Sequence, residues 1–139
     1  MNLQWLDIMN HLDCMLRSYI EIVAMFTSPS DWLSAERIAQ LCAYPKLSHF
    51  SPQEMIAYLQ DRTQIIQEKG IAARLANITR CLPTHAQHKE AIALALSAAA
   101  VENCLQRQHT EILYQMKNAF ELSEGDIEDL LSPYSLAAH

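Results

Sequence analysis

The stretch Ala91-Ile92-Ala93-Leu94-Ala95-Leu96-Ser97-Ala98-Ala99-Ala100-Val101 decides the fold of this chain. Only Ser97 is polar within it, so a helix formed here is apolar on nearly every side and has to be buried. Thr84 and Gln87, which follow Pro83, have the spacing of a capping box ahead of it. We therefore expect a central buried helix whose alanines let neighbouring helices approach closely.

Helical signals continue on both sides of this stretch. Apolar residues from Leu3 to Val23 recur at steps of three and four, which predicts a helix over about residues 3–27. A shorter helix is expected to start at Ser34, or at Asp31, and to close before Pro45. The remaining expected helices span roughly residues 52–69, 71–82, 108–120 and 124–131.

The clearest local signal is the stretch Phe50-Ser51-Pro52-Gln53-Glu54-Met55. It holds an N-cap serine, a proline at the first helical position and a glutamate that completes the capping box, and its two ends form a hydrophobic staple. Gly70 is expected to end that helix with the left-handed geometry that other residues resist. Ser123 caps the last helix, with Leu122 and Ile127 as its staple.

Length and composition agree with an all-α fold. The 139 residues are 50% hydrophobic and 19% charged, and only two are glycine, which leaves little material for tight β-turns. No stretch alternates as a strand would. We expect one domain over residues 1–139, an orthogonal or irregular bundle of about seven helices rather than a coiled coil.

The charge of the chain is concentrated in its last part. The net charge is −6; residues 1–100 hold nine acids and eight bases, whereas residues 101–139 hold seven acids and two bases. Nucleic-acid affinity comes largely from lysines and arginines that neutralise phosphates. We therefore expect no nucleic-acid partner, and an anionic membrane surface is disfavoured for the same reason.

The cysteines and the N-terminus favour the cytoplasm. Cys14, Cys42, Cys81 and Cys104 are widely spaced and stand beside apolar neighbours, as small buried hydrophobic residues do. No basic leader precedes an apolar run, and charged residues interrupt the N-terminal segment. The sequence thus predicts neither export nor membrane insertion.

Two segments, taken in order, resemble the TerB-like family of tellurite-resistance-associated proteins. The first runs from Ile22-Val23-Ala24-Met25-Phe26 through Asp31-Trp32-Leu33-Ser34-Ala35-Glu36 to a Tyr44–Glu54 stretch like the family's Pro-x-Leu-x-x-Phe connection. The second runs from Lys89-Glu90-Ala91 through Glu111-Ile112-Leu113 to Phe120-Glu121-Leu122-Ser123, which is similar to the family's Leu-Gly-Leu-Ser step. The resemblance covers most of the chain and implies a TerB-like bundle with two weakly similar halves.

The family's suspected metal-binding loops are altered in this sequence. Ser30-Asp31 stands near the first Asp-Gly pair of the family, and Glu102-Asn103 or Asn103-Cys104 stands near the second, with Thr110 or Glu111 at the following Glu position. A divalent cation is the one cofactor that the resemblance suggests. The four residues to test as its ligands are Asp31, Glu36, Glu102 and Glu111, because hard cations want several carboxylate oxygens. Helix capping by the first two and solvation of the others are the alternative.

Two further groups could bind something. His85 and His88 lie three apart on one helical face, and His109 could join them in a Zn²⁺ or Ni²⁺ site; the alternative, which we favour, is a pair of surface histidines. An acidic run could dock a basic partner, although negative charge is also stabilised at a helix N-terminus. The run consists of Glu121, Glu124, Asp126, Glu128 and Asp129.

The sequence leaves three functional hypotheses. The first is a non-enzymatic, cytoplasmic TerB-like protein linked to tellurite resistance or a stress response, as the resemblance implies. The second is a helical interaction module, a homodimer or an adaptor without a metal site, which exposure of Trp5 or Trp32 in an apolar patch would favour. The third and weakest is a small hydrolase using Cys104 and His109. We expect the chain not to be an enzyme.

Overall fold

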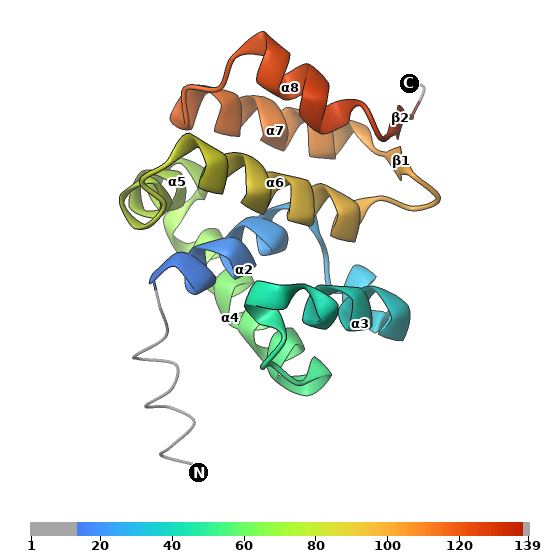
Figure 1. The fold of residues 1–139 in the computed structure, drawn as a ribbon. Coiled ribbons are helices and arrows are strands. Elements are labelled where there is room, and N and C mark those ends of the chain that lie inside the picture. Colours follow the sequence, from blue (N-terminus) through green and yellow to red (C-terminus); the bar gives the residue numbers. More distant parts are fainter. Residues whose placement is uncertain (1–13, 138–139) are drawn as a thin grey trace.

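The computed structural model describes residues 14–137, whose arrangement is shown in Figure 1. Seven α-helices form an irregular bundle in this part of the chain, as the sequence predicts. Residues 3–13 of the first expected helix lie outside the described residues. The helices are α2 (Cys14–Phe26), α3 (Ala35–Ala43), α4 (Pro52–Lys69), α5 (Ile71–Cys81), α6 (His85–Ala99), α7 (Arg107–Ala119) and α8 (Glu124–Leu131), with the 3₁₀ turns η1 (Asp31–Leu33) and η2 (Pro45–Leu47).

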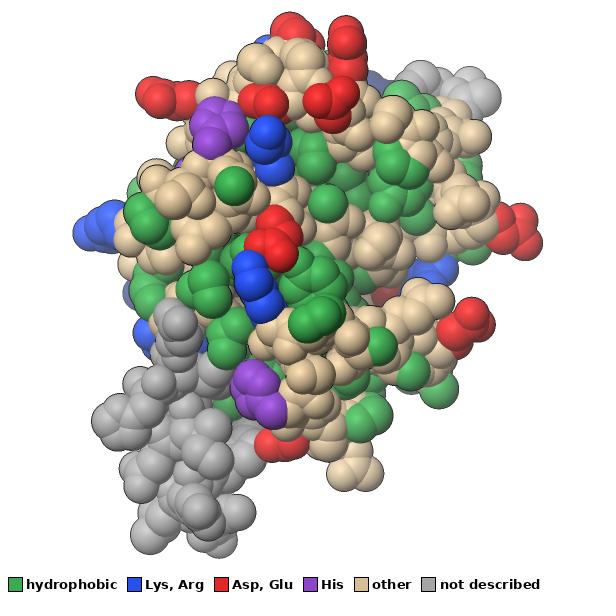
Figure 2. All heavy atoms as spheres, viewed as in Figure 1, with side chains coloured by type: hydrophobic (Ala, Val, Ile, Leu, Met, Phe, Trp, Pro, Cys, Tyr) green, Lys and Arg blue, Asp and Glu red, His purple; other side chains and the backbone are tan. Residues whose placement is uncertain are grey.

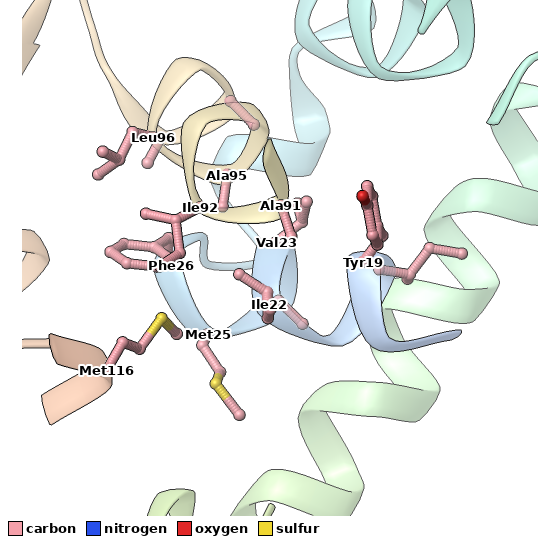
Figure 3. Packing of buried hydrophobic residues seen from close by; sticks show 14 of the residues in the cluster. Tyr19, Ile22, Val23, Met25, Phe26, Ala91, Ile92, Ala95, Leu96 and Met116 are labelled. Carbon is pink, nitrogen blue, oxygen red and sulfur yellow. The ribbon is translucent and has the colours of Figure 1, made fainter. Parts of the chain in front are cut away.

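The core is built around α6 and α2. In Figure 1, α8, α7, α6 and α2 lie one below another, and α2 packs mainly against α6 and α4. Figure 3 shows Val23 and Phe26 of α2 pointing toward Ala91, Ile92 and Ala95 of α6. The three α6 residues are 0% exposed. The prediction of a central buried helix is therefore confirmed, and its alanines let α2 approach closely.

Four of the predicted helix starts are confirmed by their hydrogen bonds. The Ser51 hydroxyl accepts from the Glu54 N–H at 3.1 Å, and the Ser51 N–H donates to the Glu54 carboxylate at 2.9 Å. Thr84 opens α6 and Ser123 opens α8 through boxes of the same kind. Ser34, the first of the two predicted starts, caps α3, while Asp31 opens η1.

Gly70 joins α4 to α5 directly, in a geometry that differs from the predicted one. Its φ of 87° is positive, as expected, but its ψ of 152° is extended rather than left-handed helical. Its N–H donates to the Ile66 carbonyl at 2.8 Å, and α5 begins at the next residue. The positive φ turns the chain between the two helices without an intervening loop.

The sequence did not predict the short strands β1 (Cys104–Leu105) and β2 (Ser135–Leu136), which pair in parallel. The central helix ends at Ala99 rather than Val101, and the chain turns back so that Val101 and Cys104 form an antiparallel bridge. The Ser135 N–H then donates to the Asn103 carbonyl at 2.8 Å. Strands of two residues are too short to show alternation, so nothing local could announce them.

Candidate functional site

A cavity of about 560 Å³ opens between the first turns of α3, the end of α6 and the C-terminal segment. Two of the four candidate metal ligands, Glu36 and Glu102, line it. The lining is largely polar, with charged side chains from α3 and from the turn after α6. The lining residues are Ser34, Glu36, Arg37, Gln40, Ser97, Ala100, Val101, Glu102, Asn103 and Tyr134.

The α3 wall is fixed by a cap and an ion pair. The Ser34 hydroxyl accepts from the Arg37 N–H at 3.3 Å, which starts the helix. The Arg37 guanidinium bonds the Asp31 carboxylate, and the same carboxylate accepts from the Ser28 N–H at 2.8 Å. Asp31 therefore organises the turn before α3, whereas the N-cap of that helix is Ser34 and not Asp31.

The opposite wall is a two-residue hairpin turn. Glu102 and Asn103 have φ angles of 52° and 60°, which are uncommon for residues other than glycine. Two hydrogen bonds between Val101 and Cys104, of 2.9 and 3.1 Å, close the turn in the manner of a type I′ hairpin. The turn presents the exposed Glu102 carboxylate at the cavity.

The cavity carries an excess of negative charge. Glu36 and Glu102 are exposed along its lining, whereas Arg37 is neutralised by its ion pair with Asp31. Like-signed charges around a concave surface raise the local concentration of oppositely charged groups. The site is therefore suited to a cation, such as the ammonium or guanidinium group of a partner.

The four predicted metal ligands are not brought together. Glu36 and Glu102 line the same cavity, Asp31 is bound to Arg37, and Glu111 lies on α7 in an exposed pair with Arg107 at 3.1 Å. Across residues 14–137, no group of three or more His, Cys, Asp or Glu residues is placed to hold a metal ion. Two carboxylates supply fewer oxygens than Ca²⁺ usually takes from a protein.

One exposed apolar side chain lines the cavity, and another precedes a lining residue in the sequence. Val101, in its lining, is 51% exposed, and Leu33, which precedes Ser34, is 87% exposed. Trp32 is buried, and its indole N–H donates to the Thr27 hydroxyl at 3.0 Å, so it forms no exposed patch. Trp5 lies outside the described residues.

The histidines have structural roles. His88 is buried rather than on the surface, so that expectation is wrong; its Nε2 lies 2.5 Å from the Leu82 carbonyl and its ring stacks on Phe120. Burial lowers the pKa of His88. His85 pairs with Asp126 at 3.1 Å, and the Nδ1 of the buried His109 accepts from the Gln106 N–H at 3.0 Å. This last bond caps α7 and occupies the nitrogen.

The cysteines differ from the prediction that all four are small buried hydrophobic residues. Cys14 and Cys81 form a disulfide that ties α2 to α5, with their Cα atoms 5.3 Å apart. Cys42 and Cys104 are free and only half-buried. The Cys104 thiol lies 3.8 Å from its neighbour's carbonyl oxygen, and no hydrogen bond joins it to His109 in the described part of the chain. The geometry gives no support to a Cys-His nucleophile.

Glu90 is the centre of a polar cluster that sequence reasoning missed. The hydroxyls of Tyr19 and Tyr44 and the ammonium group of Lys46 all donate to its carboxylate. Burial raises the pKa of Glu90, but the bonds from Lys46 and the two tyrosines outweigh burial and lower it to about 2. The donors lie 44 to 71 residues away in the sequence, so no local spacing reveals them.

The acidic run covers one end of the molecule. Figure 2 shows acidic side chains gathered over α8, at the top of the view. Glu124 pairs with Lys117, while Asp126 accepts from Ser123 and pairs with His85 and Lys89. The bond from the Ser123 N–H is the main cause that lowers the pKa of Asp126 to about 2. These two acids thus serve the local structure.

Fold and site together define an all-α bundle with an acidic, partly apolar surface cavity. Within the described residues, none of the helices combines the length and the apolar character needed to cross a membrane. A scan against protein families found no matching family, and no curated protein or solved structure matches the chain.

Proposed function

We propose that this chain is a non-enzymatic helical binding protein that docks another protein at the acidic cavity between α3 and the 101–104 turn. The exposure of Val101, which lines the cavity with Glu36 and Glu102, carries the proposal; Leu33, also exposed, precedes the lining residue Ser34. Apolar side chains are expected to be covered in a complex, because burying them removes their surface from water. The carboxylates select what is placed between them.

The expected partner presents a lysine or arginine flanked by apolar side chains. A basic group would enter between the carboxylates of Glu36 and Glu102, while its apolar neighbours cover Leu33 and Val101. Complementary charge of this kind speeds association and suppresses wrong partners. The apolar contacts supply most of the affinity.

Site-specific photocrosslinking in cells tests this docking. A photoreactive amino acid at position 33 should give one dominant adduct whose crosslinked peptide contains Lys or Arg, and the charge reversals Glu36→Lys and Glu102→Lys should abolish it. The control places the same amino acid at Tyr114, which is 47% exposed on α7. Equal labelling at both positions, or an adduct that survives both reversals, contradicts the proposal. An adduct with a second copy of this chain would show that the docked partner is the chain itself, in a homodimer.

A link to tellurite resistance or a stress response is the part of the proposal that rests on the TerB-like resemblance. The segments around Asp31–Glu36 and Phe120–Ser123 support it. The test is survival on tellurite of a host that lacks the gene, complemented with the natural chain or with Glu102→Lys. If complementation with the natural chain changes nothing, the docking proposal stands without this link.

The location of the chain completes the proposal. The sequence favours the cytoplasm, whereas a disulfide such as Cys14–Cys81 persists more readily in an oxidising compartment. Alkylation of thiols in intact cells with a membrane-permeant reagent distinguishes the cytoplasm from an oxidising compartment. Labelling of all four cysteines fits the cytoplasm, and labelling of only Cys42 and Cys104 fits an oxidising compartment.

A further inference from the structure

A second cavity, of about 410 Å³, lies among α2, α4 and α5 and shares no residue with the first. Its charged lining consists of Arg17, Arg62, Arg74 and Glu21, so arginines exceed carboxylates by two. The chain as a whole has a net charge of −6. The second cavity is therefore positively charged in a chain of negative net charge, because three helices bring their arginines together there.

Two of these arginines already have a carboxylate. Glu21 is 1% exposed, and its two oxygens accept from Arg74 at 2.6 and 2.8 Å. These hydrogen bonds are the main cause that raises the pKa of Arg74. Arg62 donates to Asp61 at 2.6 Å and lies 3.4 Å from Glu21. The single buried carboxylate is thus shared, and its hydrogen-bonding capacity is largely used.

Arg17 is different, because within residues 14–137 it makes no hydrogen bond or ion pair. Its Nε is buried and has no partner. A buried donor without a partner, on a charged group, is costly. A guanidinium group matches carboxylate and phosphate oxygens with parallel hydrogen bonds. An oxyanion would therefore match the guanidinium group of Arg17.

We propose that this cavity binds a small molecule through a carboxylate or phosphate group, with Arg17 as the principal contact and Arg62 as a second donor. The volume is within the range of small-molecule sites. Asn77 and Ser18 add neutral polar side chains to the lining. The proposal is independent of protein docking at the first cavity, and either can fail alone.

The Cys14–Cys81 disulfide helps to preform the cavity, whose wall it joins. Cys14 precedes Arg17 by one helical turn on α2, and Cys81 follows Arg74 by two turns on α5. The bond therefore fixes the separation of the two helices that carry these arginines. A preformed site loses less free energy to ordering when its ligand binds.

Isothermal titration with inorganic phosphate, and separately with succinate, tests the site at fixed ionic strength. We expect saturable binding of at least one of the two probes, weakened about tenfold or more in Arg17→Gln. The matched control is Arg80→Gln, because Arg80 is exposed on the same helix as Arg74 and does not line the cavity. Phosphate alone would define a phosphate ester as the ligand, and succinate alone would define a carboxylic acid.

A near-isosteric variant keeps the test valid if Arg17→Gln fails to fold. Asn77→Asp adds one negative charge to the lining and should weaken binding as well, while circular dichroism reports an intact fold. In ¹⁵N NMR spectra, the Arg17 Nε–H signal should shift saturably with the bound probe. Absence of saturable binding for both probes, or equal weakening in Arg17→Gln and Arg80→Gln, would overturn the proposal.

Discussion

Glu90 holds three side chains of the N-terminal half against α6. Its pKa of about 2 lies below the ordinary value of 4.5, so the folded state stabilises the ionised form of the Glu90 carboxyl group. The sign follows from linkage: this contribution is complete above about pH 4.5 and is lost as the pH falls toward 2. The Lys46 and Glu90 side chains are partly exposed, which makes their ion pair weaker than a buried one.

We predict that Glu90→Gln lowers the free energy of unfolding by roughly 1–2 kcal/mol at pH 7, and by much less at pH 3. Urea unfolding of both proteins at the two pH values measures the difference. Comparing them cancels the other acids that titrate in this range, including Asp126. Glu128→Gln is the control, since Glu128 is an exposed acid of α8. An equal difference at both pH values would show that the charge of Glu90 contributes nothing.

The joint between α4 and α5 depends on one glycine. Gly70 combines a φ of 87° with a ψ of 152°, a conformation that is essentially restricted to glycine. A Cβ at this position would meet no atom within 4 Å, so a substitution costs backbone strain and creates no clash. Gly70→Ala should therefore lower the free energy of unfolding by about 1–3 kcal/mol.

Gly125 provides the matched substitution. It lies in the first turn of α8 without a positive φ, and a Cβ there would be in ordinary contact with the Ser123 hydroxyl, at 3.7 Å. Gly125→Ala should stabilise the protein by about 0.5–1 kcal/mol, because alanine favours the helix and restricts the unfolded chain. Chemical unfolding of both variants measures whether each substitution lowers or raises the free energy of unfolding. A neutral Gly70→Ala would mean that the joint is not held in this conformation.

The disulfide joins two helices whose cysteines are 67 residues apart in the sequence. Closing a loop of that length restricts the unfolded chain, and the chain-entropy account assigns it about 4 kcal/mol. We predict that reduction, or Cys14→Ser with Cys81→Ser, lowers the free energy of unfolding by about 2–4 kcal/mol. The control, Cys42→Ser with Cys104→Ser, should leave the effect of reductant unchanged. Four titratable thiols before reduction would show that the bond does not form.

Local signals predicted the elements well, and long-range ones were not accessible. The capping boxes at Ser51 and Thr84 involve residues three positions apart, so the sequence contains the whole interaction. The β1–β2 pair, the disulfide and the Glu90 cluster join segments that are distant in the sequence. No spacing rule brings such residues together before the helices are packed. Glu36 lies in the first turn of α3 and Asp31 in the turn before it, and the sequence alone could not show that the carboxylate of Asp31 is paired with Arg37.

Arg17 shows the same limit at the second cavity. In the sequence Arg17 is one of several basic residues near acidic ones, and the spacing of charges along α2 does not predict a binding site. Only the packing of α2, α4 and α5 shows that Glu21 is taken by Arg74 and that the buried Nε of Arg17 has no partner in the described part of the chain. A site made from three helices is a property of the fold, and neither charge nor motif counting could identify it.

Helix α6 connects the N-terminal helices α2 and α3 to the C-terminal helices α7 and α8, since it contacts all four. Residues of α6 and of the helices around it are fully buried, among them Ile22 of α2, Ile92 of α6 and Leu113 of α7. Helices that share one core lose their support together. A domain built in this way should unfold in a single cooperative transition, which is the sense in which residues 1–139 are expected to form one domain.

The variants Ile22→Ala, Ile92→Ala and Leu113→Ala test this cooperativity. Each should lower the free energy of unfolding by about 2–5 kcal/mol, because truncation loses apolar contact and leaves a cavity. In each, tryptophan fluorescence and far-ultraviolet circular dichroism should give the same midpoint. If Leu113→Ala shifted only part of the dichroism signal and left the fluorescence midpoint in place, α7 and α8 would unfold separately from the N-terminal helices. The two halves would then be independent units, and the shared role of α6 in their stability would be refuted.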